Sequence, residues 1–325
     1  MKFARILGAA LMAGCVMAGS AVAAPDAYPS RPIRLISPYA AGGLTDLLAR
    51  ALGKRLAERL GQPVLVENRT GGGGVTGVDS VAKSPADGYT LVLVGQGLAS
   101  VNASLYKTLP YDTQRDFAPI SMVASFPLVL VGRPGTPPDT LSAFIAAARA
   151  KPGTIAYGSA GNASTAHLTM ELLADQAGIK VNHIPYRGEA PAFIDVIAGN
   201  TQVMFATLGG ARPLLESGRL RPIAIATKER NKMLPNVPTI SEAGVPGFEV
   251  LGWYGVLAPQ GTPKPVLDRL STEFMAMGRE PEVRDQFLER GLILAGTSSD
   301  ELGKLIRSET ERWRQVVLKA GIRAD

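Results

Sequence analysis

The chain has 325 residues, of which 46% are hydrophobic and 19% charged, and its mean hydropathy is +0.12. This composition excludes a disordered chain and supplies enough apolar side chains for about two hydrophobic cores. The net charge of +6 would suit a nucleic-acid partner, but Lys and Arg are interspersed with Asp and Glu and form no basic run. We therefore expect a solvated surface of mixed charge and no nucleic-acid partner.

The first 23 residues have the pattern of a secretory signal peptide. Lys2 and Arg5 precede an uncharged stretch over residues 6–22, and Ala-Val-Ala at 21–23 provides the small residues that signal peptidase requires. Cleavage after Ala23 leaves 302 residues, lowers the formal charge from +6 to +4 and removes Cys15, the single cysteine. The exported chain would then carry no thiol, which suits an oxidising compartment.

The alternative for this segment is a lipoprotein signal. Residues 12–15 read Met-Ala-Gly-Cys, a degenerate form of a lipid-attachment sequence. Met12 stands in place of the usual leucine and the apolar run continues past Cys15 to the cleavage site, so the cleaved signal peptide is favoured. No later stretch of the sequence is long and apolar enough to span a bilayer.

Strands alternate with helices in the first part of the mature chain. Short apolar runs predict strands over residues 31–38, 63–67 and 89–94, and helical spacing predicts helices over 44–60 and 75–83. The first helix has leucine at every fourth position, and Gly61 ends it. This alternation with short connections predicts a mainly parallel sheet covered by helices.

The pattern restarts after an extended apolar stretch over residues 120–131. Helices are predicted over 141–150, 164–177, 190–198 and 211–217, and strands over 154–158, 181–186, 202–206 and 222–226. A second extended stretch over 250–258 leads into helices over 263–277, 281–290 and 299–319, which we expect to pack on the first lobe. The predicted fold class is α/β, with two mainly parallel, helix-covered sheets and a cleft between two lobes.

The two extended stretches would cross between the lobes and divide the chain. Residues 1–23 form the signal peptide, residues 24–125 plus 248–325 form lobe 1, and residues 126–247 form lobe 2. We expect the lobes to close around a ligand by rotation about the crossing segments near Phe126 and Gly252.

Two strand-to-helix loops at equivalent places in the lobes resemble each other. Residues 38–46 and residues 158–167 each contain small residues followed by a hydroxyl side chain. Small side chains leave backbone N–H groups uncovered at a helix N-terminus, where free donors and the helix dipole attract an anion. The alternative is that Thr45, Ser164 and their neighbours are ordinary N-caps, but the repetition favours an anion held between the loops.

The sequence contains only incomplete versions of enzymatic motifs. Residues 72–77 match G-x-G-x-x-G, yet the acidic residue expected about 20 positions later is missing, and Ser159 is out of register for a G-x-S-x-G nucleophile. His167 and Glu171 lie four residues apart on one predicted helix and could share a metal, but the chain has only two histidines and no evident third ligand. We expect no enzyme activity, no cofactor and no metal.

Short motifs are spread along almost the whole mature chain. They are Tyr-Pro-Ser-Arg-Pro-Ile at 28–33, Gly42-Gly43 with Asp46, Val-Glu-Asn at 66–68, Asp-Gly-Tyr-Thr-Leu at 87–91, Leu-Pro-Tyr-Asp at 109–112, Asp-Phe-Ala-Pro-Ile at 116–120, His167-Leu168, His-Ile-Pro-Tyr at 183–186, Pro-Asn-Val-Pro-Thr at 235–239 and Trp-Tyr-Gly at 253–255. Together they make the sequence similar to the Bug proteins, the extracytoplasmic solute receptors of tripartite tricarboxylate transporters.

The resemblance implies a type II periplasmic-binding-protein fold and a periplasmic receptor that captures a small organic carboxylate. The ligand would be held between the two matching loops, largely by backbone groups and bridging waters, and delivered to integral-membrane subunits of the transporter. Two departures, Ala41 where many members have proline and Ala163 where many have glycine, affect loop shape and ligand choice. A receptor that signals to a membrane sensor is the alternative, and we expect a monomer in either case.

The candidate ligand-binding residues come mainly from the two loops. They are Tyr39, Ala41, Gly42, Gly43, Thr45 and Asp46 in the first, and Ser159, Gly161, Asn162, Ala163, Ser164 and His167 in the second. Arg187 could offer a fork to a carboxylate or be an exposed strand-end residue, and Asp195 could meet a ligand ammonium or be a solvated helix residue. Gln96 and Thr207 follow strands and could reach the cleft mouth, whereas packing at the hinge is favoured for Trp253 and Tyr254.

Overall fold

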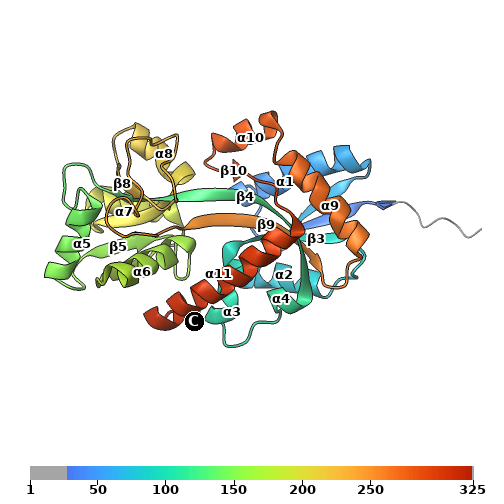
Figure 1. Ribbon diagram of the computed structural model, residues 1–325, viewed down its shortest axis with the longest axis horizontal. Coiled ribbons are helices and arrows are strands. Elements are labelled where there is room, and N and C mark those ends of the chain that lie inside the picture. Colours follow the sequence, from blue (N-terminus) through green and yellow to red (C-terminus); the bar gives the residue numbers. More distant parts are fainter. Residues whose placement is uncertain (1–27, 324–325) are drawn as a thin grey trace, which may run out of the picture.

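Two long strands, β4 (Phe117–Gly132) and β9 (Leu251–Pro259), run antiparallel beside each other through the middle of the molecule. The computed structural model describes residues 28–323, and Figure 1 shows these strands joining one group of elements at each end. Most of β4 is buried, as expected for an apolar stretch that has neighbours on both edges. The expected signal peptide and its cleavage site lie outside the described residues.

Lobe 1 is built on three parallel strands with helices between them. Its elements are β1 (Ile33–Ser37), α1 (Leu44–Leu60), β2 (Val64–Asn68), η1 (Gly72–Gly74), α2 (Val75–Ala82), β3 (Thr90–Gly95), η2 (Gly97–Val101), α3 (Asn102–Leu105) and α4 (Thr113–Asp116). Strand β1 lies between β2 and β3, and β9 pairs antiparallel with β3.

Lobe 2 repeats this arrangement. Its elements are α5 (Leu141–Ala150), β5 (Ala156–Ser159), α6 (Thr165–Ala177), β6 (Asn182–Pro185), α7 (Glu189–Ala198), β7 (Val203–Thr207), α8 (Leu208–Glu216) and β8 (Arg221–Ile225). Strand β5 lies between β6 and β7 in parallel register, and β4 pairs antiparallel with β7. Strands β5 and β7 therefore occupy the places that β1 and β3 have in lobe 1, and the loops after β1 and β5 are equivalent.

The crossing strands join the two lobes into one mixed sheet. Its order is β2-β1-β3-β9-β4-β7-β5-β6, and β8 and β10 (Ile293–Leu294) also pair with β4. The predicted α/β class is confirmed, with parallel pairing among the outer strands of each lobe. The pairings of β4 and β9 are antiparallel because these strands carry the chain back and forth between the lobes.

Three helices follow the second crossing strand. They are α9 (Lys264–Met277), α10 (Pro281–Leu288) and α11 (Ser299–Ala320), and Figure 1 shows α11 lying obliquely beside the crossing strands. Leu302 and Ile306 of α11 belong to a core cluster with β3 and β9, whereas Trp313 and Val317 belong to a cluster that contains Phe144 of α5. Helix α11 is therefore shared between the lobes, where the sequence alone suggested a tail on lobe 1.

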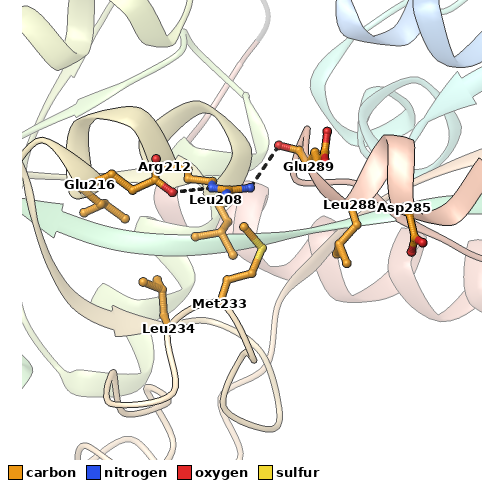
Figure 2. Close-up of a pocket in the computed structure, with 9 residues that line it drawn as sticks. Leu208, Arg212, Glu216, Met233, Leu234, Asp285, Leu288 and Glu289 are labelled. Carbon is orange, nitrogen blue, oxygen red and sulfur yellow. Dashed lines mark hydrogen bonds and ion pairs between the residues drawn. The ribbon is translucent and has the colours of Figure 1, made fainter.

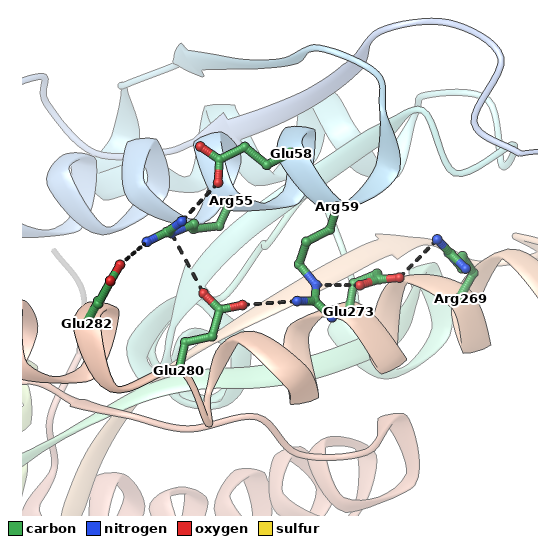
Figure 3. A network of polar contacts seen from close by, with 7 residues as sticks. All are labelled: Arg55, Glu58, Arg59, Arg269, Glu273, Glu280 and Glu282. Carbon is green, nitrogen blue, oxygen red and sulfur yellow. Dashed lines mark hydrogen bonds and ion pairs between the residues drawn. The ribbon is translucent and has the colours of Figure 1, made fainter.

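Charged side chains fasten α9 and α10 to α1 (Figure 3). Arg59 donates to the buried carboxylate of Glu273 at 2.5 Å and to Glu280 at 3.0 Å, and Arg55 donates to Glu282 at 3.0 Å. A network of this kind fixes geometry more than a single exposed ion pair does, since an exposed pair contributes only about 0–1 kcal/mol. Within residues 28–323, no helix combines the length and the apolar character that crossing a membrane requires.

Candidate functional site

The loop after β1 presents the open N-terminus of a long helix. Residues 40–44 are exposed, and the N-cap of α1 is Gly43, which has no side chain to accept the first amides. Within the described chain, the N–H groups of Leu44 and Thr45 donate to no other group. Helix α1 is 17 residues long, and its dipole and free donors are of the kind that would stabilise an anion at this loop.

The buried side chain of Asp46 fixes the conformation of this loop. It is 3% exposed, and its carboxylate accepts hydrogen bonds from Arg50 Nε at 3.0 Å, the Gly42 N–H at 2.9 Å and Asn68 Nδ2 at 2.8 Å. The bonds from Arg50, Gly42 and Asn68, in that order, lower the pKa of Asp46 to about 2 despite its burial. The carboxylate therefore holds Gly42 in its left-handed conformation, with φ of +82°, and the exposed donors beyond it remain free.

Tyr254 of β9 contacts this loop. The Thr45 hydroxyl donates to the Tyr254 oxygen at 3.3 Å, and the Tyr254 ring meets the ring of Tyr39 edge to face at 6.5 Å. The Tyr39 hydroxyl in turn accepts the Gly95 N–H at 2.9 Å. Trp253, the neighbouring residue, is 2% exposed and packs in the core, so the two aromatic residues of the crossing strand point to opposite faces of the sheet.

The equivalent loop of lobe 2 uses several of its own donors. The Gly161 N–H donates to Ser159 Oγ at 3.1 Å, the Ala163 N–H to His167 Nδ1 at 2.9 Å, and the Ser164 N–H to the Gly161 carbonyl at 3.2 Å. Ser164 also caps α6 by accepting from the His167 N–H at 3.3 Å. Five of the residues expected to bind a ligand thus bond to one another and set the shape of the loop.

Other backbone N–H groups of this loop make no hydrogen bond within the described chain. The N–H groups of Asn162, Thr165 and Ala166 donate to nothing else in the described chain, and the last two belong to the first turn of the 13-residue helix α6. The Asn162 side chain donates to the Arg323 carbonyl at 2.9 Å, which ties the loop to the segment after α11. An anion facing this loop would meet the amides of Asn162, Thr165 and Ala166.

Two stacked histidines contact the lobe 2 loop. The rings of His167 and His183 are 3.7 Å apart and almost parallel, and His183 also stacks on Tyr157 at 4.9 Å. Burial lowers the pKa of His167 to about 3, with a further contribution from His183, and burial lowers the pKa of His183 to about 4. Both rings are therefore neutral at pH 7, and His167 Nδ1 is free to accept the Ala163 N–H.

The same cluster bears on the enzymatic alternatives. Ser159 Oγ lies 2.6 Å from His183 Nε2, and Ser159 is fully buried. His167 Nε2 lies 3.8 Å from Glu171 Oε1, and Glu171 accepts the Tyr157 hydroxyl at 2.5 Å. In residues 28–323 no group of three His, Cys, Asp or Glu side chains is placed to hold a metal ion.

Glu189, which the sequence did not single out, is the first residue of α7 and lies at the same sheet edge as the lobe 2 loop. Its carboxylate accepts the Thr207 N–H at 2.6 Å and the Thr207 hydroxyl at 2.8 Å. Burial raises the pKa of Glu189, and both bonds from Thr207 oppose that shift. Burial raises the pKa of Tyr254, the hydrogen bond with Thr45 opposes this increase, and the charge of Glu189 adds a smaller one.

Three of the remaining candidates lie in different surroundings. Gln96 is 2% exposed and its amide donates to Glu309 of α11, so its side chain points away from the two loops. Asp195 accepts hydrogen bonds from the Tyr186 hydroxyl and from Asn200. Arg187 is exposed beside the lobe 2 loop, to which its neighbour Gly188 is bonded through the Ala160 carbonyl at 3.1 Å.

A separate cavity of about 500 Å³ lies between α8 and α10 (Figure 2). Leucine and methionine side chains make up much of its wall, namely Leu208, Leu215, Met233, Leu234 and Leu288. Arg212 of α8 points across it, pairing with Glu216 at 2.7 Å and reaching the Glu289 carbonyl at 3.5 Å. This cavity contains none of the residues expected to bind a ligand.

Comparison with known proteins supports a receptor architecture. A family model described as "Tripartite tricarboxylate transporter family receptor" matches residues 48–322. Protein BugT of Bordetella pertussis (strain Tohama I) is 38% identical over 325 residues, covering 99% of each chain. A solved structure of an R. palustris protein with adipate is 35% identical with a TM-score of 0.78, covering 91% of this chain and 99% of that one. MatC from Rhodopseudomonas palustris with bound malate is 31% identical with a TM-score of 0.74, covering 89% and 100%.

Proposed function

The chain belongs to the receptor family of tripartite tricarboxylate transporters, and on that premise we propose that it captures a small organic carboxylate between its lobes and delivers it to the membrane subunits of such a transporter. The observation that carries this proposal is the uncapped, exposed N-terminus of α1, together with the helix N-terminus at the equivalent place in lobe 2. The proposal places the mature protein in the periplasm, as a monomer exported by a cleaved signal peptide.

The chemistry of the two loops suits a carboxylate. Free amides at Leu44 and Thr45 would bind one oxygen pair, and the open amides around Thr165 would face the ligand from lobe 2. Structures of similar proteins are described with adipate and with malate, both of which carry carboxylates. Capture and release need no bond to be made or broken, so we propose a receptor and not an enzyme.

Closure would occur about the paired crossing strands. Phe126 of β4 and Gly252 of β9 are direct cross-strand partners. A Cβ atom on Gly252 would lie 2.1 Å from the Phe126 ring, so glycine is required there for the ring to cover the neighbouring strand. Rotation at this point would bring α1 and α6 together around the ligand, and small-angle scattering would then give a smaller radius of gyration with ligand than without it.

The direct test is a binding screen. Native mass spectrometry of the protein as purified would identify a retained ligand, and a thermal-shift panel of aliphatic and aromatic carboxylates would follow. A ligand at 100 times its dissociation constant should add about 2.7 kcal/mol to the free energy of unfolding. If no carboxylate in a broad panel raises the melting temperature, the proposed function is wrong.

A further inference from the structure

The carboxylate of Glu189 occupies a space that the fold keeps open for it. Both of its oxygens are fixed by Thr207, at 2.6 Å from the amide and 2.8 Å from the hydroxyl. A Cβ atom on Gly210 would lie 2.4 Å from Glu189 Oε2. Any side chain at position 210 would therefore push the carboxylate out of its place.

Glu189 also lies at the sheet edge that carries the lobe 2 loop, because β5, β6 and β7 run parallel and this loop, Glu189 and Thr207 are at or after their carboxyl ends. The Gly188 N–H before it donates to the Ala160 carbonyl at 3.1 Å, which attaches the start of α7 to the lobe 2 loop. Thr207 pairs with Leu128 of β4. Four residues earlier on the same strand, Ala124 pairs with Tyr254, whose hydroxyl oxygen accepts the Thr45 hydroxyl of the lobe 1 loop. The carboxylate therefore lies beside the lobe 2 loop, on the lobe 2 side of the crossing strands.

Capping of α8 alone does not account for the carboxylate. Thr207 is the N-cap of α8, and its own hydroxyl already accepts the Gly210 N–H at 3.2 Å. A carboxylate has about four acceptor positions, and the bonds from Thr207 use two of them. Glu189 is half-buried, and within the described chain its carboxylate accepts from no group other than Thr207, so acceptor capacity remains.

We propose that Glu189 is a specificity-determining residue that selects carboxylates which also carry a hydrogen-bond donor, an ammonium or a hydroxyl group, on the carbon chain. This inference rests on the proposed function, because it assumes that a carboxylate is bound at the N-terminus of α1. The donor group would bond to the free acceptor positions of Glu189. A plain dicarboxylate of the same length would present like charge or an apolar methylene to Glu189, which costs affinity.

The test compares ligands that differ only in this group. Isothermal titration calorimetry would be run with succinate, malate and aspartate, with glutarate, 2-hydroxyglutarate and glutamate, and with 3-phenylpropionate, phenyllactate and phenylalanine. In at least one triad the wild-type protein should bind a donor-bearing member about tenfold or more tightly than the plain acid. The amino and hydroxy members of the triad show which donor is preferred.

Variants then assign the preference to Glu189. Glu189→Gln should reduce the discrimination to about threefold or less and leave the affinity for the plain acid unchanged or higher. Gly210→Ala, which keeps the charge of Glu189 but displaces its carboxylate, should reduce the discrimination between ligands as well. Glu216→Gln removes the same charge from the exposed end of α8, where the side chain is 63% exposed, and should keep the wild-type preference.

Three results would overturn the inference. The first is a wild-type protein that binds carboxylates without distinguishing members of any triad. The second is a Glu189→Gln variant that loses the same factor for every member, because Glu189 would then act only in holding α8. The third is a lack of binding by all nine compounds. When a wider carboxylate panel also gives no binding, the proposed function itself fails, whereas the first two results leave it intact.

Discussion

Gly209 and Gly291 bring the backbones of the two lobes into direct contact. A Cβ atom on Gly291 would lie 2.3 Å from the Cα of Gly209, and one on Gly209 would lie 2.2 Å from the Arg290 carbonyl oxygen. Gly209 is in the first turn of α8 in lobe 2, and Gly291 follows α10 in lobe 1. Next to this contact, Arg212 reaches the Glu289 carbonyl (Figure 2). The lobes are therefore joined at a point outside the crossing strands.

This contact predicts an unusual response to Gly209→Ala. In an exposed helix, replacing glycine by alanine stabilises the protein by about 1 kcal/mol. Here the new methyl group would press on the Arg290 carbonyl, so we expect a loss of roughly 1–3 kcal/mol in the free energy of unfolding and a changed radius of gyration. Urea denaturation and small-angle scattering would measure these two effects.

Gly97→Ala is the matched control. A Cβ atom on Gly97 has no neighbour within 4 Å, so this substitution should leave both the stability and the lobe arrangement close to wild type. If Gly209→Ala is as stable as wild type and gives an unchanged scattering curve, the contact between Gly209 and Gly291 does not hold the two lobes together.

Helix ends were predictable where local signals coincide. The sequence predicts helices over residues 44–60 and 141–150, and α1 and α5 have these bounds. For α1 the three middle leucines of the repeat, Leu48, Leu52 and Leu56, lie on the buried face, and Gly61, with φ of +69°, forms the C-cap. The two-residue strand β10 and the short segments η2 and α3 were missed, because they are too short to show a period.

The candidate site was predictable only as a pair of loops. Small residues before a hydroxyl are a local signal, and the equivalent positions of the two loops follow from the repeated strand order. The partners that shape each loop are distant in sequence: Asn68 for Asp46, and His183 for Ser159 and His167. Glu189 was missed for the same reason, because only the fold brings it to Thr207, 18 residues later.

The stacked histidines predict a loss of stability in mild acid. Unfolded histidine has a pKa near 6.5, whereas burial lowers the pKa of His167 to about 3 and that of His183 to about 4. The unfolded chain therefore takes up protons first as the pH falls. Their contribution is complete above about pH 6.5 and is lost as the pH falls from there towards 4. For His167 alone we expect a loss of roughly 1–2 kcal/mol between pH 7 and pH 5.

Urea denaturation at pH 7, 6 and 5 would measure this dependence. The pKa of Asp46 is about 2, so its contribution is lost only below about pH 4 and does not overlap this range. His167→Asn keeps an oxygen that can accept the Ala163 N–H but does not titrate, so its stability should fall less steeply between pH 7 and pH 5. Equal slopes for the variant and the wild type would contradict the assignment to this pair.

Substitutions at Ala163 test the anion site of lobe 2. Ala163 has φ of +58°, a left-handed conformation that asparagine and aspartate tolerate better than other residues, so neither variant should unfold the protein. Ala163→Asp places a negative charge beside the open amides of Thr165 and Ala166. Repulsion and competition for those amides should cost about 3 kcal/mol or more in binding free energy, over a hundredfold in affinity.

Ala163→Asn is the uncharged control of similar size and should lose much less affinity. Calorimetric titration with the ligand found in the screen would measure both variants. Near-wild-type affinity for Ala163→Asp would show that no anion binds at this loop. Equal small losses of affinity in both variants would show that the loop only caps α6.

Glu309 of α11 connects the lobes through a buried carboxylate. It is 9% exposed, and it accepts hydrogen bonds from the Gln96 amide after β3 and from Trp313 Nε1 at 2.5 Å. Arg312 lies 3.4 Å from its other oxygen. Gln96 belongs to lobe 1, while Trp313 packs in the core of lobe 2, so removing the carboxylate affects both sides of the hinge.

Glu309→Ala should therefore be among the more damaging single substitutions in α11. It would leave the Gln96 amide and the Trp313 indole N–H buried without an acceptor, at an expected cost of about 2–4 kcal/mol in the free energy of unfolding. Glu311→Ala, two residues later, removes an exposed carboxylate that pairs with Arg314 and should cause no measurable change. Urea denaturation of both variants gives the comparison. Similar stabilities would mean that the contact between α11 and Gln96 does not hold the lobes together.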